Sequence, residues 1–255
     1  MAKPDRTRTS KRRADQALVA TGLADSRAKA QALILAGAVY AGTRRIDKAC
    51  ETVAADQELW VKGRDHPWVS RGGVKLAHAL DHFAITPEGR TCLDIGASTG
   101  GFTDVLLARG AARVWAVDVG HGQFDWRLRN DPRVGLKERT NARHLGRADV
   151  PDEIDLVTCD ASFIGLRVVL PAGLGLTRPG AHLIALIKPQ FEVGPGRLSK
   201  GGVVRDPALH REVCARIQAW LEGDMGWPVA GVVESPITGP KGNVEFLIAA
   251  RRPGP

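Results

Sequence analysis

The chain has 255 residues, of which 44% are hydrophobic and 25% are charged, a composition typical of a globular protein with room for a small and a medium-sized domain. Lysine and arginine outnumber aspartate and glutamate by 36 to 28, so the formal net charge is +8, which favours polyanionic partners. The longest run without Asp, Glu, Lys or Arg, Ala30–Thr43, is too short to span a bilayer as a helix. The four widely spaced cysteines exclude a disulfide framework, and no apolar segment follows the basic N-terminus as in a signal peptide. We therefore expect a cytoplasmic protein that does not enter a membrane.

The N-terminal part of the chain divides into a basic tail and a small domain. Residues 1–11 are polar and basic, and we expect them to be disordered until an anionic partner binds. Residues 12–63 alternate between short helical and short extended patterns. We expect helices over Asp15–Thr21, stopped by Gly22, and from a cap at Asp25 or Ser26 to Gly37, and strands around Ala38–Tyr40 and Glu58–Val61.

Three short sequences in this region resemble the S4 RNA-binding domain. They are Arg13-Ala14-Asp15, Gly22-Leu23-Ala24-Asp25-Ser26-Arg27 and Ala36-Gly37-Ala38-Val39. The resemblance implies a small α+β domain whose second helix and following loop present basic residues to structured RNA. The residues expected to contact RNA are Arg13, Arg27, Lys29, Arg44 and Arg45.

The pattern changes after residues 64–69, which contain Pro67 and are expected to form a linker. A helix is predicted over Ser70–Phe83, and apolar strands then alternate with helical segments. The predicted strands are Thr91–Ile95, Arg113–Val117, Val134–Glu138, Ile154–Cys159, His182–Ile187, Val229–Val233 and Val244–Ala249, with helices such as Phe102–Arg109 and Pro207–Leu221 between them. This alternation predicts a parallel, doubly wound α/β sheet over residues 70–255.

The most specific motif is the glycine-rich turn Asp94–Thr103, which joins a predicted strand to a predicted helix. Glycines let the backbone approach a ligand closely, and the start of a helix offers unpaired N–H groups. The spacing Gly96-x-x-x-Gly100-Gly101 differs from the G-x-G-x-x-G spacing of a dinucleotide site. Asp94 would suit a ligand with an ammonium group, and Asp118, at the end of the next strand, would suit a ribose diol.

This turn resembles motif I of the Rossmann-like class I methyltransferases, which implies S-adenosylmethionine as the cofactor. Asn141 follows the third predicted strand, where an adenine contact and an ordinary turn asparagine are equally good interpretations. The residues expected to bind the cofactor are Asp94, Gly96, Ser98, Thr99, Gly100, Gly101, Phe102, Asp118 and Asn141.

Four polar residues lie at positions where chance would rarely place them. Asp160 and Lys188 end apolar strands, where open α/β sheets bind ligands, Lys75 lies in the first helix of this part, and Glu245 lies just inside the last predicted strand. A lysine that ends an apolar strand is costly unless it has a partner or a function. Each residue alone could form an ordinary surface ion pair. Together they resemble the K-D-K-E tetrad of FtsJ-type ribose 2′-O-methyltransferases.

The whole pattern over residues 12–250 resembles the TlyA family of rRNA 2′-O-methyltransferases, also called hemolysin A-like proteins. Asp118-Val119-Gly120-His121-Gly122-Gln123 and Lys188-Pro189-Gln190-Phe191-Glu192 add to the resemblance, whereas Ala161 and the first linker residues depart from it. It implies S-adenosylmethionine-dependent methylation of a ribose, of cytidine, in ribosomal RNA. Lys188 would accept the proton of the 2′-hydroxyl, Lys75 would disfavour a second positive charge on Lys188, and Asp160 and Glu245 would orient the two lysines.

Two other functions remain open at this point: a membrane-active hemolysin, and a non-catalytic RNA-binding factor in ribosome assembly. The loop from Gly194 to Gly202 is interpreted as a mobile basic lid or a plain surface loop, and Trp68 and Trp126 are expected to pack in a core or interface rather than stack on bases. The seven histidines have no metal-ligand spacing, so no metal is predicted. The sequence names neither the nucleotide nor the ribosomal subunit, and it leaves the oligomeric state open, with a monomer as one option.

Overall fold

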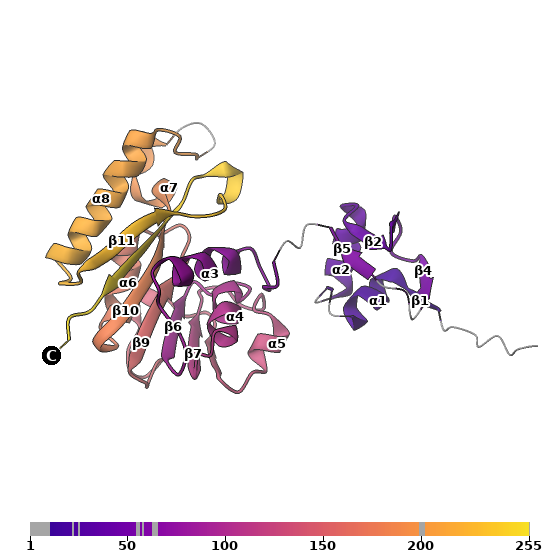
Figure 1. Ribbon diagram of the computed structural model, residues 1–255, viewed down its shortest axis with the longest axis horizontal. Coiled ribbons are helices and arrows are strands. Elements are labelled where there is room, and N and C mark those ends of the chain that lie inside the picture. The colour runs from indigo at the N-terminus through magenta and orange to yellow at the C-terminus, as the bar shows by residue number, and fades with distance from the viewer. Residues whose placement is uncertain are drawn as a thin grey trace, which may run out of the picture. The chain divides into compact units, whose positions relative to one another are not determined.

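The computed structural model describes residues 11–254, apart from Gly22, Asp25, residues 55–56, Glu58, residues 63–65 and residues 199–201. Several expected features therefore lie outside the described residues: the tail up to residue 10, Gly22, Asp25, Glu58, residues 64–65 of the linker and residues 199–201 of the expected lid. The chain divides into two units, Met1–Pro67 and Trp68–Pro255 (Figure 1).

The small unit combines two helices with short antiparallel strands. Its elements are β1 (Lys11–Arg13), α1 (Ala14–Ala20), α2 (Arg27–Leu35), β2 (Val39–Ala41), β3 (Arg44–Arg45), β4 (Thr52–Ala54) and β5 (Leu59–Val61). Strand β1 pairs with β4, and the other three form a sheet in the order β3-β2-β5. Helix α2 begins after Ser26, whose hydroxyl accepts a hydrogen bond from the backbone N–H of Lys29 at 3.2 Å. The core includes Leu18, Ile34 and Ile46.

The large unit contains a seven-stranded sheet with helices on both faces (Figure 1). Its strands are β6 (Thr91–Ile95), β7 (Arg113–Val117), β8 (Val134–Lys137), β9 (Ile154–Cys159), β10 (Thr177–Ile187), β11 (Val229–Glu234) and β12 (Phe246–Arg251). Its helices are α3 (Gly72–His82), α4 (Gly101–Ala108), α5 (Trp126–Arg129), α6 (Leu166–Leu174), α7 (Pro189–Glu192) and α8 (Pro207–Gly223), with 3-10 turns η1 (Ala142–His144), η2 (Pro195–Arg197) and η3 (Pro240–Gly242).

The strand order is β11-β12-β10-β9-β6-β7-β8. Strand β12 runs antiparallel to both of its neighbours, whereas β6 to β10 are parallel. The expectation of a fully parallel sheet was therefore wrong at this edge. Only residues 235–245 join β11 to β12, which is too short for the crossover that a parallel pair needs. The Rossmann-like α/β class is confirmed by this order.

Two hydrophobic layers hold the sheet. Helices α6 and α8 cover one face through residues such as Leu170 and Ile217. Helices α3, α4 and α5 cover the other, with Leu76 and Leu106 fully buried. Because successive side chains of a strand point to opposite faces, β6 contributes Leu93 to the first layer and its neighbour Cys92 to the second. The two layers together cover both faces of the sheet.

Most predicted strands match the structure closely, with two exceptions, of which the second concerns the site. Strand β10 starts at Thr177 rather than His182, because it continues through an irregular stretch that contains Gly180, with φ of 79°. Strand β12 starts at Phe246, so Glu245 precedes the strand and does not lie inside it as expected. None of the helices in the described part of the chain is long and apolar enough to cross a membrane.

Candidate active site

Two adjoining cavities open at the carboxyl ends of the central strands. The chain leaves β6 in one direction along the sheet and β9 in the other, so the loops after these neighbouring strands diverge and leave a crevice. We call the first the tetrad cavity, because Lys75, Asp160, Lys188 and Glu245 all line it. We call the second the Asp118 cavity, because it also reaches the loop after β7. Gly96, Ser98, Asp160 and Ser162 line both, so the two are continuous.

The glycine-rich loop forms the floor between the cavities. Gly96 has φ of 79°, and a Cβ atom there would lie 2.9 Å from the backbone of Ala161, so only glycine lets the loop approach the segment after β9 this closely. Gly100, with φ of 95°, precedes α4, and a Cβ there would lie 2.5 Å from Leu128. The structure therefore explains both glycines by close contacts between backbone and neighbouring elements.

Several expected cofactor residues line the cavities. Ser98 borders both cavities, Thr99, Gly101 and Phe102 border the tetrad cavity, and Asn141 borders the Asp118 cavity. The Asn141 side chain also accepts a hydrogen bond from the Arg143 backbone at 3.1 Å and so caps η1. Asn141 is thus both a turn asparagine and a cavity residue.

Asp94 lies elsewhere than expected. It is fully buried beneath the loop, where its carboxylate accepts hydrogen bonds from Thr103 Oγ1 at 2.7 Å and Thr158 Oγ1 at 3.2 Å. Burial raises the pKa of Asp94 to about 7, although both hydroxyls act in the opposite direction. The structure therefore does not present this carboxylate for the expected ion pair with a ligand ammonium. It ties the end of β6 to α4 and β9.

Asp118 holds the opposite wall of the crevice. Its Oδ2 atom accepts a hydrogen bond from the Ser98 backbone at 2.8 Å, and its Oδ1 atom accepts one from the Gly120 backbone at 2.7 Å. These bonds fix the carboxylate at the border of the Asp118 cavity. A carboxylate held in this way after the second strand can accept hydrogen bonds from a diol.

The four tetrad residues form two ion pairs. Lys75 Nζ lies 2.6 Å from Glu245 Oε2, and Lys188 Nζ lies 2.5 Å from Asp160 Oδ1. Lys75, Lys188 and Glu245 are buried, with 1% of Glu245 exposed. Each lysine has its own carboxylate partner, an arrangement in keeping with the expectation that Asp160 and Glu245 orient the two lysines. The pairs bring α3, the loop after β9, the end of β10 and the loop before β12 to one cavity.

Sequence reasoning missed two polar partners of this tetrad. Ser162 Oγ accepts a hydrogen bond from Lys188 Nζ at 2.9 Å, and the carbonyl of Asp160 accepts another at 3.1 Å. Gln190 Nε2 donates to Glu245 Oε1 at 3.4 Å. Ser162 and Gln190 each lie two residues after a tetrad residue, Asp160 and Lys188. This spacing could have indicated them, because residues just after a strand end lie in the same loop as the residue that ends the strand. Lys188 is thus held by three oxygens.

The residues expected to bind RNA lie in the small unit and are not part of the cavities. Arg13 and Arg27 both bind the buried carboxylate of Asp15 at 3.0 Å. Arg44 pairs with Glu51, Arg45 pairs with Asp47 at 2.6 Å, and Lys29 is exposed. In the large unit, Trp68 packs against Gly73 in the core as expected, whereas Trp126 is 59% exposed.

No group of three or more His, Cys, Asp or Glu side chains in the described ranges is arranged to hold a metal ion.

Comparisons with known proteins place this geometry in a family. The model of the FtsJ-like methyltransferase family matches residues 68–252. The 16S/23S rRNA (cytidine-2′-O)-methyltransferase TlyA of Mycobacterium tuberculosis is 50% identical, over 94% of this chain and 89% of the relative. Hemolysin A of Brachyspira hyodysenteriae is 39% identical, over 92% of this chain and 98% of the relative. A solved structure from Streptococcus thermophilus that carries the name hemolysin is 39% identical, covers 97% of this chain and 90% of its own, and has a TM-score of 0.74.

Proposed function

The chain belongs to the FtsJ-like methyltransferases of the TlyA family, which depend on S-adenosylmethionine, and from this we propose that it methylates the ribose 2′-oxygen of a cytidine in ribosomal RNA. The main support for the proposal is that two ion pairs, Lys75–Glu245 and Lys188–Asp160, lie in a cavity that is continuous with the Asp118 cavity. The names of the relatives supply the class of RNA.

The residues of the Asp118 cavity fit S-adenosylmethionine. The cavity has a volume of about 720 Å³, within the range of small-molecule sites. Asp118 would bind the ribose diol, Asn141 would lie beside the adenine, and the loop from Gly96 to Phe102 would bind the methionine part. Asp94 would act from below by holding that loop. When bound, the cofactor supplies an electrophilic methyl group whose bonding electron pair stays on sulfur.

Lys188 is the residue we assign to the proton of the 2′-hydroxyl. A ribose hydroxyl is a weak nucleophile near neutral pH, so a positioned acceptor is needed. In the ion pair with Asp160 the Lys188 amine carries a proton, which it would give to water before the reaction. The free amine would then take the hydroxyl proton while the oxygen gains the methyl group. Asp160 and Ser162 orient the amine, and the ammonium that forms is neutralised by Asp160. The Lys75–Glu245 pair forms the other wall and positions the ribose.

The small unit supplies the cationic surface for RNA in this proposal. Lys29 is exposed, and Arg13, Arg27, Arg44 and Arg45 have side chains between 40% and 59% exposed although each has an acidic partner. The surface ion pairs Arg44–Glu51 and Arg45–Asp47 contribute little to stability, so a phosphate can replace their carboxylates at low cost. Binding would then show the salt dependence of phosphate contacts.

Two substitutions of Lys188 test the assignment. We expect Lys188→Ala to lower methyl transfer to ribosomal RNA by at least about 100-fold, because a general base contributes about 100-fold or more. Lys188→Arg keeps a positive charge beside Asp160 but cannot release its proton near neutral pH, so it should be equally inactive. Transfer is measured with labelled S-adenosylmethionine, and cofactor binding is measured by calorimetry.

The matched control is Lys137→Ala, which removes a lysine from the end of β8, away from the tetrad cavity. Both Lys188 variants should bind the cofactor as the wild type does. Activity of Lys188→Arg close to that of the wild type would mean that the lysine acts only through its charge, and activity of Lys188→Ala would remove it from the mechanism.

A further inference from the structure

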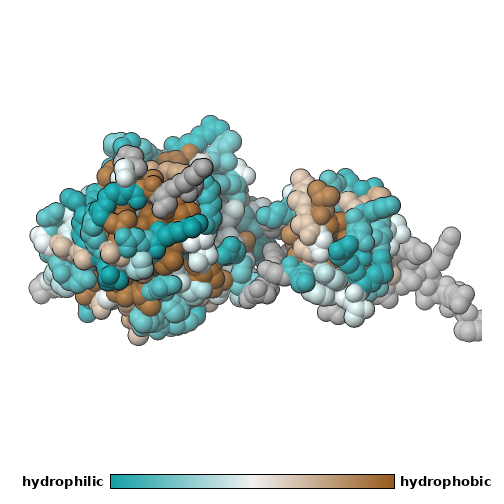
Figure 2. Space-filling view, turned by 90° about the horizontal axis from the view of Figure 1, so that it is seen from above, coloured by the Kyte–Doolittle hydropathy of each residue, from teal (hydrophilic) through white to brown (hydrophobic). Residues whose placement is uncertain are grey.

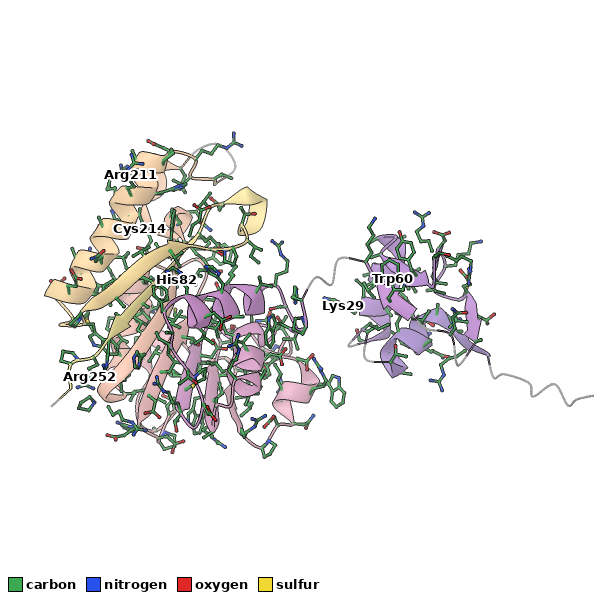
Figure 3. All side chains as sticks on the ribbon, in the orientation of Figure 1. Lys29, Trp60, His82, Arg211, Cys214 and Arg252 are labelled. Carbon is green, nitrogen blue, oxygen red and sulfur yellow. The ribbon has the colours of Figure 1, made fainter. Side chains whose placement is uncertain are left out.

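An aromatic row lies on the outer face of the three-stranded sheet in the small unit. Tyr40 on β2 is opposite Arg45 on β3 and opposite Trp60 on β5, so the three side chains share one face of the sheet. Their neighbours along the strands, such as Val39 and Leu59, point into the hydrophobic core. Arg45, Tyr40 and Trp60 therefore form a continuous row that faces away from the core, which we call the aromatic row. Trp60 is labelled in Figure 3.

The two rings are ordered before any ligand binds. Tyr40 and Trp60 are stacked, with centroids 4.5 Å apart and an angle of 14° between their planes. The indole N–H of Trp60 donates a hydrogen bond to the Gly42 carbonyl at 2.7 Å, which fixes the ring's rotation. Trp60 is nevertheless 42% exposed. A large aromatic ring that is both fixed and exposed loses little conformational entropy when something stacks on it.

The surroundings of the row are cationic. Residues 39–48 and 59–62 contain Arg44, Arg45, Lys48 and Lys62 but one acidic residue, Asp47. Asp47 pairs with Arg45, and Arg44 pairs with Glu51 from the neighbouring segment. The Arg45 and Asp47 side chains are 57% and 60% exposed, so water screens their attraction and a phosphate can compete for Arg45.

The size of the row distinguishes a nucleobase from a protein partner. Stable protein interfaces have a broad apolar centre, whereas this row consists of two stacked rings beside an arginine. Figure 2 shows hydrophilic residues, in teal, over much of the small unit. Single-stranded nucleic acids are bound by this combination of aromatic rings for bases and cations for the backbone.

We propose that Tyr40 and Trp60 form a stacking site for one unpaired base of the RNA substrate, with Arg45 binding the adjoining phosphate. The site rests on the proposed function only in taking RNA as the substrate. With this site, the small unit would contact a base of the RNA in addition to its phosphates. Every base has an aromatic face, so the site selects an unpaired nucleotide rather than a particular base.

The test uses the full-length protein and a fluorescently labelled oligoadenylate, whose bases have no pairing partner. We expect Trp60→Ala to weaken binding, measured by fluorescence anisotropy, by about tenfold, because stacking on an aromatic residue accounts for a loss of that order. Trp60→Phe keeps a ring and should retain most of the affinity. Val19→Ala is the matched control, since Val19 is an exposed apolar residue of α1 in the same unit.

Two outcomes would overturn the site. One is an unchanged affinity of Trp60→Ala for oligoadenylate. The other is an equal loss of affinity for oligoadenylate and for inorganic polyphosphate, which has charge but no bases. Photocrosslinking of oligoadenylate to the unmodified protein is an independent measurement. It should attach RNA to Tyr40 or Trp60, and adducts confined to other segments would contradict the proposal.

The failure of this site and the failure of the proposed function give different results. Normal methyl transfer with no effect of Trp60→Ala on RNA binding would remove the site and leave the function. Binding of oligoadenylate that depends on Trp60, without methyl transfer to ribosomal RNA, would leave the site and remove the function.

Discussion

Two buried aspartates show how the partner of a carboxyl group decides its charge. Asp15 in the small unit is bound by Arg13 and Arg27, and the hydrogen bonds from Arg13 hold its pKa well below the usual range. Asp94 in the large unit accepts hydrogen bonds from the hydroxyls of Thr103 and Thr158, and burial raises its pKa to about 7. The same residue type is therefore a permanent anion in one unit and a group that titrates near neutral pH in the other.

The position of Asp94 makes the stability of the large unit depend on pH. A carboxyl group whose pKa is higher in the folded than in the unfolded chain destabilises the fold as pH rises from the unfolded value, about 3.9, to the folded value. The penalty is complete above pH of about 7 and amounts to at most about 4 kcal/mol. Asn does not titrate, so the free energy of unfolding of Asp94→Asn should fall less than that of the wild type as pH rises from about 5 to about 8.

Denaturant unfolding of both proteins across this range measures the effect. The difference between their free energies of unfolding should grow with pH and level off above about pH 7, since the other titrating groups are common to both. A difference that stays constant over the whole range would show that Asp94 is ionised throughout.

The loop between β11 and β12 decides where Glu245 lies. Sequence patterns predicted the strands well, because apolar runs of this length between turn signals have few alternative structures. They placed Glu245 inside the last strand, since Val244 and Phe246 on either side of it are apolar. In the structure, backbone hydrogen bonds close this loop: the Ser235 N–H donates to the Glu245 carbonyl, and the Gly239 N–H donates to the Asn243 carbonyl. The strand begins only at Phe246.

The pairing of Lys75 with Glu245 could not be predicted from spacing. The two residues lie 170 positions apart, and they meet because β12 returns antiparallel beside β10 and brings its preceding loop towards α3. The sequence alone gave residue types at strand ends and a family resemblance. Which lysine meets which carboxylate depends on topology and on packing between distant elements.

Gly239 in the same loop gives a test of this arrangement. A Cβ atom at Gly239 would lie 2.1 Å from Glu245 Oε1, and Glu245 is too buried to move aside freely. We expect Gly239→Ala to displace the carboxylate from Lys75 and to lower methyl transfer between about tenfold and 100-fold, as small misplacements in active sites do. Cofactor affinity should change little, because Gly239 does not border the Asp118 cavity.

Gly146→Ala serves as the control, since a Cβ atom there would meet no neighbour within 4 Å. Rates of methyl transfer for the two variants and the wild type are compared under saturating cofactor. If Gly239→Ala turns over as fast as Gly146→Ala, the Lys75–Glu245 pair has no part in positioning the substrate.

At the scale of the whole molecule, the two units divide the work in our account. The large unit contains both cavities, and the small unit carries the aromatic row and the basic residues to which we assign RNA binding. The sequence predicted the α/β class and the change of pattern between the two parts, because composition and periodicity report on local structure. It did not predict the aromatic row, since the register that aligns Arg45, Tyr40 and Trp60 is set by tertiary pairing.

The most direct test of the central claim is a map of ribose methylation in ribosomal RNA by mass spectrometry. The map compares cells that lack this protein with the same cells supplied with the wild type or with Lys188→Ala. We predict that at least one cytidine carries a 2′-O-methyl group only when the wild type is present. Identical maps in all three cases, a methyl group on a base instead of the ribose, or a modification that persists with Lys188→Ala would contradict the account.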